Sequence, residues 1–160
     1  MTHGSRAPAV FSIAAGILFC VDVVLKMIAR RFLMEPRVFV FTPAGPIGFI
    51  PSVNDVLAFS LPIPNVWIWP VGGVVVLALI GMLGRISDFK FQIRDRRALA
   101  ITAIVLGAMS NLTDRTFLGG VTDYLSLTNA FPAFNIADLL ILGGVIVWAI
   151  SERRREYAIA

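Results

Sequence analysis

The sequence predicts an all-α membrane protein: a bundle of four transmembrane helices, with a small outward-facing cradle of strands and loops between the first and second helices. Hydrophobic residues make up 58% of the 160-residue chain and charged residues only 15%, whereas an average soluble domain has roughly 25% charged residues. The apolar residues gather in four runs, and the basic residues lie in short segments beside them. Because so small a globule could not bury this much apolar surface in water, we expect a single domain over 1–160 with lipid as its solvent.

The four expected spans follow the apolar runs, at about 9–29, 66–83, 99–112 and 136–150. The first has the ~20 residues that a bilayer crossing requires, and Asp22 and Lys26 near its far end favour a retained helix over a cleavable signal peptide. The second carries Trp67 and Trp69 near its start, as in an interfacial aromatic belt. The last two runs are short, so we expect each to include flanking residues or to tilt little.

Two outward loops are expected, at about 30–65 and 113–135. The first contains five prolines between Pro43 and Pro64, mixed with short β-branched and aromatic stretches. This pattern favours short strands and turns over one helix. It is the origin of the predicted cradle.

Basic residues predict the orientation of the chain. Nine Lys and Arg residues lie in the N-terminal segment, in 84–97 and in the C-terminal segment, and five lie elsewhere. The positive-inside rule then places both termini in the cytoplasm and both long loops outside. These flanks suit anionic lipid headgroups and account for the net charge of +4, so we expect no nucleic-acid partner.

The polar segment 111–138 carries the candidate chemistry, because it contains Asp114, Asp123 and Asp138 between two apolar runs. A carboxylate at the edge of a hydrocarbon layer loses hydration, so without a compensating partner it stays protonated or shares a proton. Two such groups held together divide one proton, and the pair can activate water and protonate a leaving group. The interpretation is a membrane-embedded aspartyl hydrolase.

Other chemistries have less support. His3 is the single histidine, so a Ser-His-Asp triad and a His-rich metal site lack the residues they need. A Ser-Lys dyad would need Lys26 beside Ser52 or Ser60, and no local motif supports it. Three aspartates without histidine are a weak case for a divalent cation. We therefore expect no metal and no cofactor.

Five short motifs stand in order along the chain: DVVLK at 22–26, NDVLAFSL at 54–61, NLTDR at 111–115, GGVTDY at 119–124 and FNIAD at 134–138. They resemble the DxxxK, NxGxAFSL, GNLxDRxxxGxVxDF and FNxAD blocks of the lipoprotein signal peptidase family, also called signal peptidase II. The chain departs from these blocks at Val56 and Ser110, which replace glycines, and at Tyr124, which replaces a phenylalanine. Val56 matters most, because glycine often serves a positive φ or a close backbone approach.

The resemblance implies an aspartic endopeptidase of the bacterial plasma membrane that removes the signal peptide from lipid-modified prolipoproteins, cleaving before the diacylglyceryl-cysteine. It implies that Asp123 and Asp138 are the catalytic pair, near the outer face. For them to meet, the strand-like stretch after Asp123 must fold back toward the fourth helix. The implied partners are lipidated precursors and membrane lipids, and we expect a monomer. The implied supporting or substrate-binding residues are Asn111, Asp114, Arg115, Asn135, Asn54, Asp22 and Lys26.

Several alternatives stay open from the residues alone. Asp22 and Lys26 are four residues apart, a spacing that also suits a plain intrahelical ion pair. Asp114 beside Arg115 also suits a helix-end pair, and the segment 135–138 suits a simple helix start. A small proton-coupled transporter or channel subunit would use the same carboxylates as proton sites. A non-catalytic membrane scaffold is a third reading.

Overall fold

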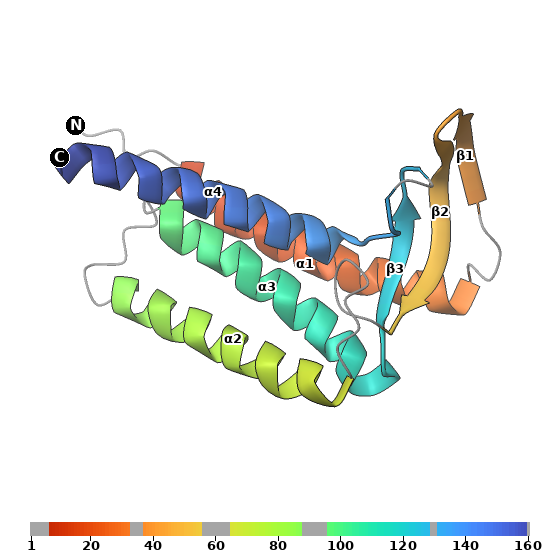
Figure 1. Cartoon of the computed structure of the whole chain (residues 1–160), viewed down its shortest axis with the longest axis horizontal. Coiled ribbons are helices and arrows are strands. Elements are labelled where there is room, and N and C mark those ends of the chain that lie inside the picture. Colours follow the sequence, from red (N-terminus) through yellow and green to blue (C-terminus); the bar gives the residue numbers. More distant parts are fainter. Residues whose placement is uncertain (1–6, 33–36, 56–64, 88–95, 129–130, 160) are drawn as a thin grey trace.

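The computed structural model describes residues 7–32, 37–55, 65–87, 96–128 and 131–159, which form four long helices and a three-stranded antiparallel sheet (Figure 1). This arrangement confirms the four predicted helices and the strands expected between the first two. The sheet also includes a third strand, which comes from between the third and fourth helices. Val56 and the rest of 56–64 lie outside the described residues. In chain order the elements are α1 (Ala7–Phe32), β1 (Arg37–Thr42), β2 (Gly45–Asn54), α2 (Asn65–Ser87), α3 (Arg96–Leu118), β3 (Val121–Ser126) and α4 (Ile136–Ile159).

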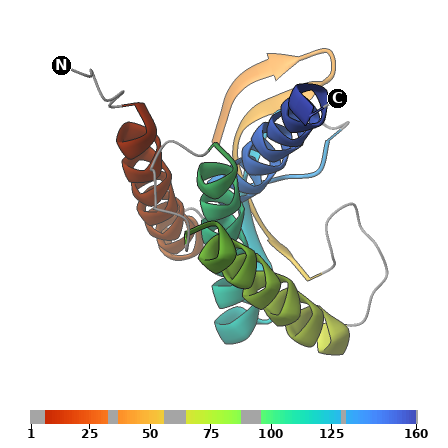
Figure 2. The same cartoon turned by 90° about the vertical axis from the view of Figure 1, so that its left-hand side faces the viewer.

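Helix α3 is the central element of the bundle. It packs against α1, α2 and α4, most extensively against α4, and the end-on view shows the other three helices around it (Figure 2). The sheet stands at one end of the bundle, and α1 begins and α4 ends at the opposite end (Figure 1). In the part of the chain that the structure describes, no helix reaches the combination of length and hydropathy expected of a membrane span.

Glycines allow α3 and α4 to approach closely at two points. A Cβ atom on Gly107 would lie 2.5 Å from the carbonyl oxygen of Ala137, and one on Gly144 would lie 2.7 Å from that of Ala100. Neither position can hold a larger residue unless a backbone moves. The first contact fixes the start of α4 against the middle of α3.

Helix α3 continues six residues beyond the predicted span and includes Asp114 and Arg115. It ends at Gly119, whose φ of 78° and whose N–H bond to the Arg115 carbonyl at 3.1 Å form a left-handed helix cap. The predicted boundary at Leu112 rested on where the apolar run stops. The helix goes on because the Asp114 carboxylate has buried partners on other elements, as described below.

Strand β2 is the middle strand of the sheet and pairs antiparallel with β1 and β3. Its register with β3 places Ser52 opposite Asp123 and Asn54 opposite Val121. After β3 the chain returns, and Leu125 and Phe134 exchange backbone hydrogen bonds of 2.8 and 2.9 Å. The chain therefore reverses after β3, as expected if Asp123 and Asp138 are to meet, and it then reaches the start of α4.

The outer faces of the helices are rich in large apolar side chains, whereas the interior contains both a small apolar core and a group of buried polar side chains. Large apolar side chains on the outer helix faces are exposed by 57 to 69%, among them Ile13, Ile17 and Met27 of α1, Leu77 of α2 and Leu142 of α4. Polar side chains occupy the interior near the sheet instead. The buried polar and charged residues are Asp22, Lys26, Ser110, Asp114, Thr122, Asp123 and Asn135.

Candidate active site

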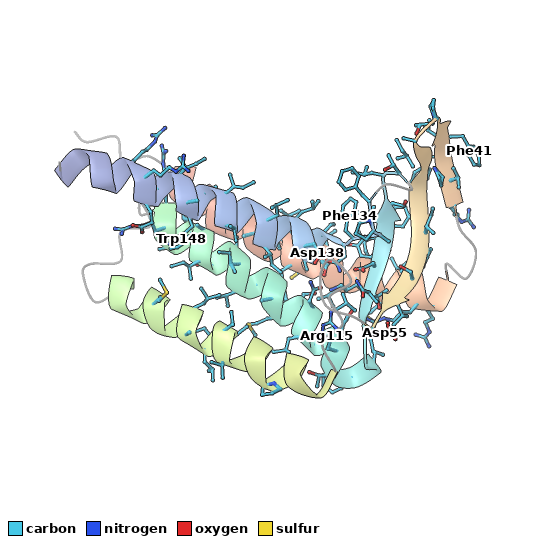
Figure 3. The ribbon with its side chains drawn as sticks, in the orientation of Figure 1. Phe41, Asp55, Arg115, Phe134, Asp138 and Trp148 are labelled. Carbon is cyan, nitrogen blue, oxygen red and sulfur yellow. The ribbon has the colours of Figure 1, made fainter. Side chains whose placement is uncertain are left out.

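The candidate site lies where β3 meets the start of α4. Asp123 is the third residue of β3, and Asp138 is in the first turn of α4. Figure 3 places Asp138 at the end of α4 that faces the sheet. Fifteen positions separate the two aspartates in the sequence, and the return of the chain through Phe134 brings their elements together.

Asn135 hydrogen-bonds to both aspartates. Its side-chain Nδ2 donates to Oδ1 of Asp123 at 2.7 Å and to the Thr122 carbonyl at 3.4 Å. Its Oδ1 accepts the Asp138 N–H at 2.9 Å, while its own N–H donates to Oδ2 of Asp138 at 3.1 Å. The reciprocal pair is a capping box, so the helix start expected for 135–138 is present. The same residue holds the carboxylate of Asp123 beside that helix start.

Asp123 is buried, and a second amide holds its other oxygen. Nδ2 of Asn54, at the end of β2, donates to Oδ2 of Asp123 at 3.1 Å. Burial raises the pKa of Asp123 to about 6, and the nearby charge of Asp138 acts in the same direction. The hydrogen bonds from Asn54 and Asn135 and the charge of Lys26 oppose this rise. The carboxyl group therefore titrates close to neutral pH.

Asp138 receives a hydrogen bond from α3. Nδ2 of Asn111 donates to Oδ1 of Asp138 at 2.8 Å, and Oδ1 of Asn111 accepts a bond from the Lys26 ammonium at 2.7 Å. Because an ammonium group only donates, Lys26 determines which end of the amide faces Asp138. Three elements thus hold this carboxylate: α1 through Lys26, α3 through Asn111, and α4 itself.

Asp22 and Lys26 form the intrahelical ion pair that their spacing allowed, at 3.0 Å. Both side chains are almost completely buried, at 0% and 2% exposure. The Ser110 hydroxyl donates to Asp22 at 2.6 Å and accepts from Lys26 at 3.0 Å. Through Ser110, the pair therefore joins α1 to α3.

Asp114 joins three elements of the fold. It forms an ion pair with Arg30 of α1 at 2.6 Å and lies 3.7 Å from the Lys26 ammonium. It also accepts the N–H of Thr122 in β3 at 2.9 Å, and Arg30 donates to the Thr122 hydroxyl at 2.6 Å. Asp114 therefore connects β3 to α1. Its sequence position beside Arg115 indicated only a pair at the end of the helix.

Arg115 lies in the last turn of α3, at the sheet end of the bundle (Figure 3). The carboxylates of Asp123 and Asp138 are near enough to attract its guanidinium electrostatically. Its position places a permanent positive charge close to the two aspartates.

Four residues that the sequence did not single out for the site also belong to this network: Arg30, Ser110, Thr122 and Tyr124. A signal for Arg30 existed, because it follows Lys26 by four residues and therefore shares its helix face. Ser110 and Tyr124 depart from the family blocks, but nothing nearby in the sequence indicates their contacts. Thr122 had no local signal, since its partners come from α1, α3 and the Asn135 side chain.

The arrangement can perform acid-base chemistry. Among the described residues, no group of three or more His, Cys, Asp or Glu side chains is placed to hold a metal ion. Two carboxyl groups, one of which titrates near neutral pH, can supply a base and an acid in the same reaction.

Comparisons with known proteins agree on one family. The model of the signal peptidase (SPase) II family matches residues 14–153. A lipoprotein signal peptidase of Geobacter metallireducens is 30% identical over 153 residues, which cover 92% of this chain and 92% of that protein. Another, of Geobacter sulfurreducens, is 39% identical over 87 residues, 51% of this chain and 54% of that protein.

A solved structure shares the fold. It is that of a bacterial membrane enzyme, determined by the in meso method at 2.3 Å resolution. The TM-score is 0.73 at 21% sequence identity, and the match covers 94% of this chain and 89% of the other.

Proposed function

This chain belongs to the signal peptidase II family, and we propose that it cleaves lipid-modified prolipoproteins within the membrane plane, just before the diacylglyceryl-cysteine. The family consists of aspartic-type peptidases that remove signal peptides from prolipoproteins. The family assignment does not support the alternative of a proton-coupled transporter or channel subunit.

Asp123 and Asp138 are the proposed catalytic pair. The observation that carries this assignment is that Asn135 hydrogen-bonds to both, with bonds of 2.7 to 3.1 Å. One carboxylate deprotonates a water molecule, while the other, protonated, polarises the scissile carbonyl and then protonates the leaving amine. The pair shares its proton, so the two titration steps belong to both residues together.

Amide groups are proposed to keep the two carboxylates in place. Asn54 and Asn135 each donate to one oxygen of Asp123, and Asn111 donates to Asp138. Donors fixed in this way stabilise the ionised carboxylate and leave its remaining lone pairs for water. Amides suit this task because they do not ionise near neutral pH, so they donate hydrogen bonds without gaining or losing a proton.

Charged residues have two proposed roles. The buried ion pair of Asp22 and Lys26 and the pair of Asp114 and Arg30 support the elements that carry the site. Arg115 supports catalysis by attracting the negative charge that develops near the pair during the reaction.

We propose that the four helices span the bacterial plasma membrane, with the sheet and the catalytic pair near its outer face. Exposed apolar residues on the outer helix faces and polar residues inside are the distribution expected of a protein solvated by lipid. Both termini are then cytoplasmic, in accord with the bias of basic residues. A site between helix ends can receive the acyl chains of the substrate from the lipid and the peptide from outside.

The protein is proposed to act as a monomer. Asn54, Asn111 and Asn135 of one chain are sufficient to hold the two aspartates, so the proposed site needs no residue from a second copy. Its partners are the lipidated precursors and the surrounding lipids.

The test is cleavage of a purified precursor, lipidated or unlipidated, by the purified protein in lipid vesicles. We expect cleavage of the lipidated precursor alone, and none with Asp123→Asn or Asp138→Asn. Glu152→Gln is the matched control, since it neutralises a carboxylate that pairs with Arg97 away from the site. Normal turnover by either Asp→Asn variant would refute the proposed pair. Proton flux without proteolysis would instead support the transporter.

A further inference from the structure

The start of α4 has an unusual set of hydrogen-bond partners. The first N–H groups of a helix have no acceptor within the helix. Here the N–H groups of four successive residues each have a side-chain acceptor. The bonds run from Asn135 to Asp138 Oδ2 at 3.1 Å, from Ile136 to the Tyr124 hydroxyl at 3.2 Å, from Ala137 to Asp22 Oδ1 at 3.1 Å, and from Asp138 to Asn135 Oδ1 at 2.9 Å.

Two of these acceptors come from other elements and are bonded to each other. The Tyr124 hydroxyl of β3 donates to Oδ1 of Asp22 in α1 at 2.8 Å. Both side chains are completely buried, at 0% exposure. The tyrosine hydroxyl thus both accepts from the first turn of α4 and donates to α1, and it links these helices to the strand that carries Asp123.

The Asp22 carboxylate, which bonds to the Tyr124 hydroxyl, is itself held by several other groups. Its other oxygen, Oδ2, accepts from the Ser110 hydroxyl at 2.6 Å and pairs with Lys26 at 3.0 Å. The carboxylate is therefore held from α1, α3, β3 and α4 at once. A group bonded to it has little freedom to move.

We propose that the Tyr124 hydroxyl is a positioning group for proteolysis: it sets the first turn of α4, and hence Asp138, relative to the adjacent Asp123. This inference rests on the proposed function of Asp123 and Asp138 as the catalytic pair. Tyr124 has no direct role in the chemistry. It acts through Ile136 and Asp22, whose positions determine where the Asp138 carboxylate lies.

Tyr124→Phe isolates the hydroxyl from the rest of the side chain. The ring stacks on Phe49 with centroids 5.7 Å apart and planes 11° from parallel, and phenylalanine keeps this packing. What is lost is the acceptor for the Ile136 N–H and one donor to Asp22. Because small displacements of catalytic groups are costly, we expect kcat to fall by about tenfold or more, with KM changed less than about twofold.

Ile136→Pro removes the same bond from its other end. Proline is favoured at the first position of a helix, where its missing N–H is tolerated. We expect Ile136→Pro to lower kcat as well. The double variant with Tyr124→Phe should be little worse than Tyr124→Phe alone, because the bond between Ile136 and Tyr124 is already absent there, together with the bond from Tyr124 to Asp22. Ser151→Ala is the control, because it deletes a hydroxyl that bonds within α4 to the Val147 carbonyl.

The experiment measures kcat and KM on a lipidated precursor for these variants and for Asp123→Asn, together with the folded fraction of each. A selective fall in kcat for Tyr124→Phe, with Ser151→Ala at the wild-type value, supports the positioning role. If Tyr124→Phe keeps the wild-type kcat, or loses it only in proportion to the folded fraction, the inference is overturned while an inactive Asp123→Asn leaves the proposed function standing. An active Asp123→Asn would overturn the proposed function itself.

Discussion

The Lys26 ammonium and the Asn111 side chain are joined by a 2.7 Å hydrogen bond across α1 and α3. The bond turns the amide so that its nitrogen donates to Asp138 at 2.8 Å. Lys26 also pairs with Asp22 at 3.0 Å. This one buried cation therefore compensates the charge of Asp22 and orients the amide of Asn111 that donates to Asp138. Removing this cation should therefore affect both stability and activity.

Lys26→Met should lower the free energy of unfolding by about 3 to 5 kcal/mol, because it leaves the buried Asp22 carboxylate without its cation. Denaturant unfolding in detergent or lipid measures the change. Arg97→Met is the control: its pair with Glu152 is partly exposed, so a loss of only about 1 kcal/mol or less is expected. Equal losses for the two variants would contradict the view that burial makes the Lys26 pair important.

Arg30→Leu should weaken the attachment of β3 to α1. It removes the ion pair with Asp114 and the bond to the Thr122 hydroxyl, for an expected loss of about 2 kcal/mol in the free energy of unfolding. Arg31→Leu changes the neighbouring, exposed residue and should alter stability by less than about 0.5 kcal/mol. The two variants have the same composition, so a difference between their unfolding midpoints isolates the contacts of Arg30.

Gly107→Ala should reduce activity by displacing the start of α4. The added Cβ atom would meet the Ala137 carbonyl oxygen at 2.5 Å and the Ile141 side chain at 2.8 Å. Since Asp138 follows Ala137 directly, we expect a fall of about tenfold or more in kcat on a lipidated precursor. Gly143→Ala is the control, because nothing lies within 4 Å of its Cβ position. Wild-type activity of Gly107→Ala would show that α4 can shift without consequence.

Activity should decline as the pH rises above about 6. Burial raises the pKa of Asp123 from 3.8 to about 6, so the pair holds its shared proton at pH 5 and loses it at higher pH. When both carboxylates are ionised, the pair has no acid for the leaving amine, and kcat/KM falls. The profile of kcat/KM against pH measures the position of this decline.

Asn54→Leu should move the same decline to higher pH. The hydrogen bond from Asn54 lowers the pKa of Asp123, so its removal lets that pKa rise further and the proton is held to a higher pH. Thr42→Val, which deletes a hydroxyl bonded within the hairpin to the Gly45 carbonyl, should leave the profile in place. A decline that shifts to lower pH in Asn54→Leu would contradict the assignment of this bond.

Local sequence was sufficient to predict the helices and the strands between the first two, and the resemblance to the family motifs singled out Asp123 and Asp138. Apolar runs longer than a typical strand indicate helices, and prolines among β-branched residues indicate turns and strands. Helical spacing alone also placed Asp22 and Lys26 on one face. The motif around Asn135 indicated a helix start, because a capping box involves residues only three apart.

The partners of these residues were decided by the tertiary structure. Asp114 is paired with Arg30, far away in the sequence. Its neighbour Arg115 is attracted by Asp123 and Asp138 more strongly than by Asp114. In the sequence, Tyr124 is a conservative replacement of the phenylalanine in the family motif. In the structure, its hydroxyl donates a hydrogen bond to Asp22, 102 positions away. Such contacts depend on how whole elements pack, and a buried polar group takes whichever partner the packing brings within reach, because leaving it unpaired costs more than any local preference can offset.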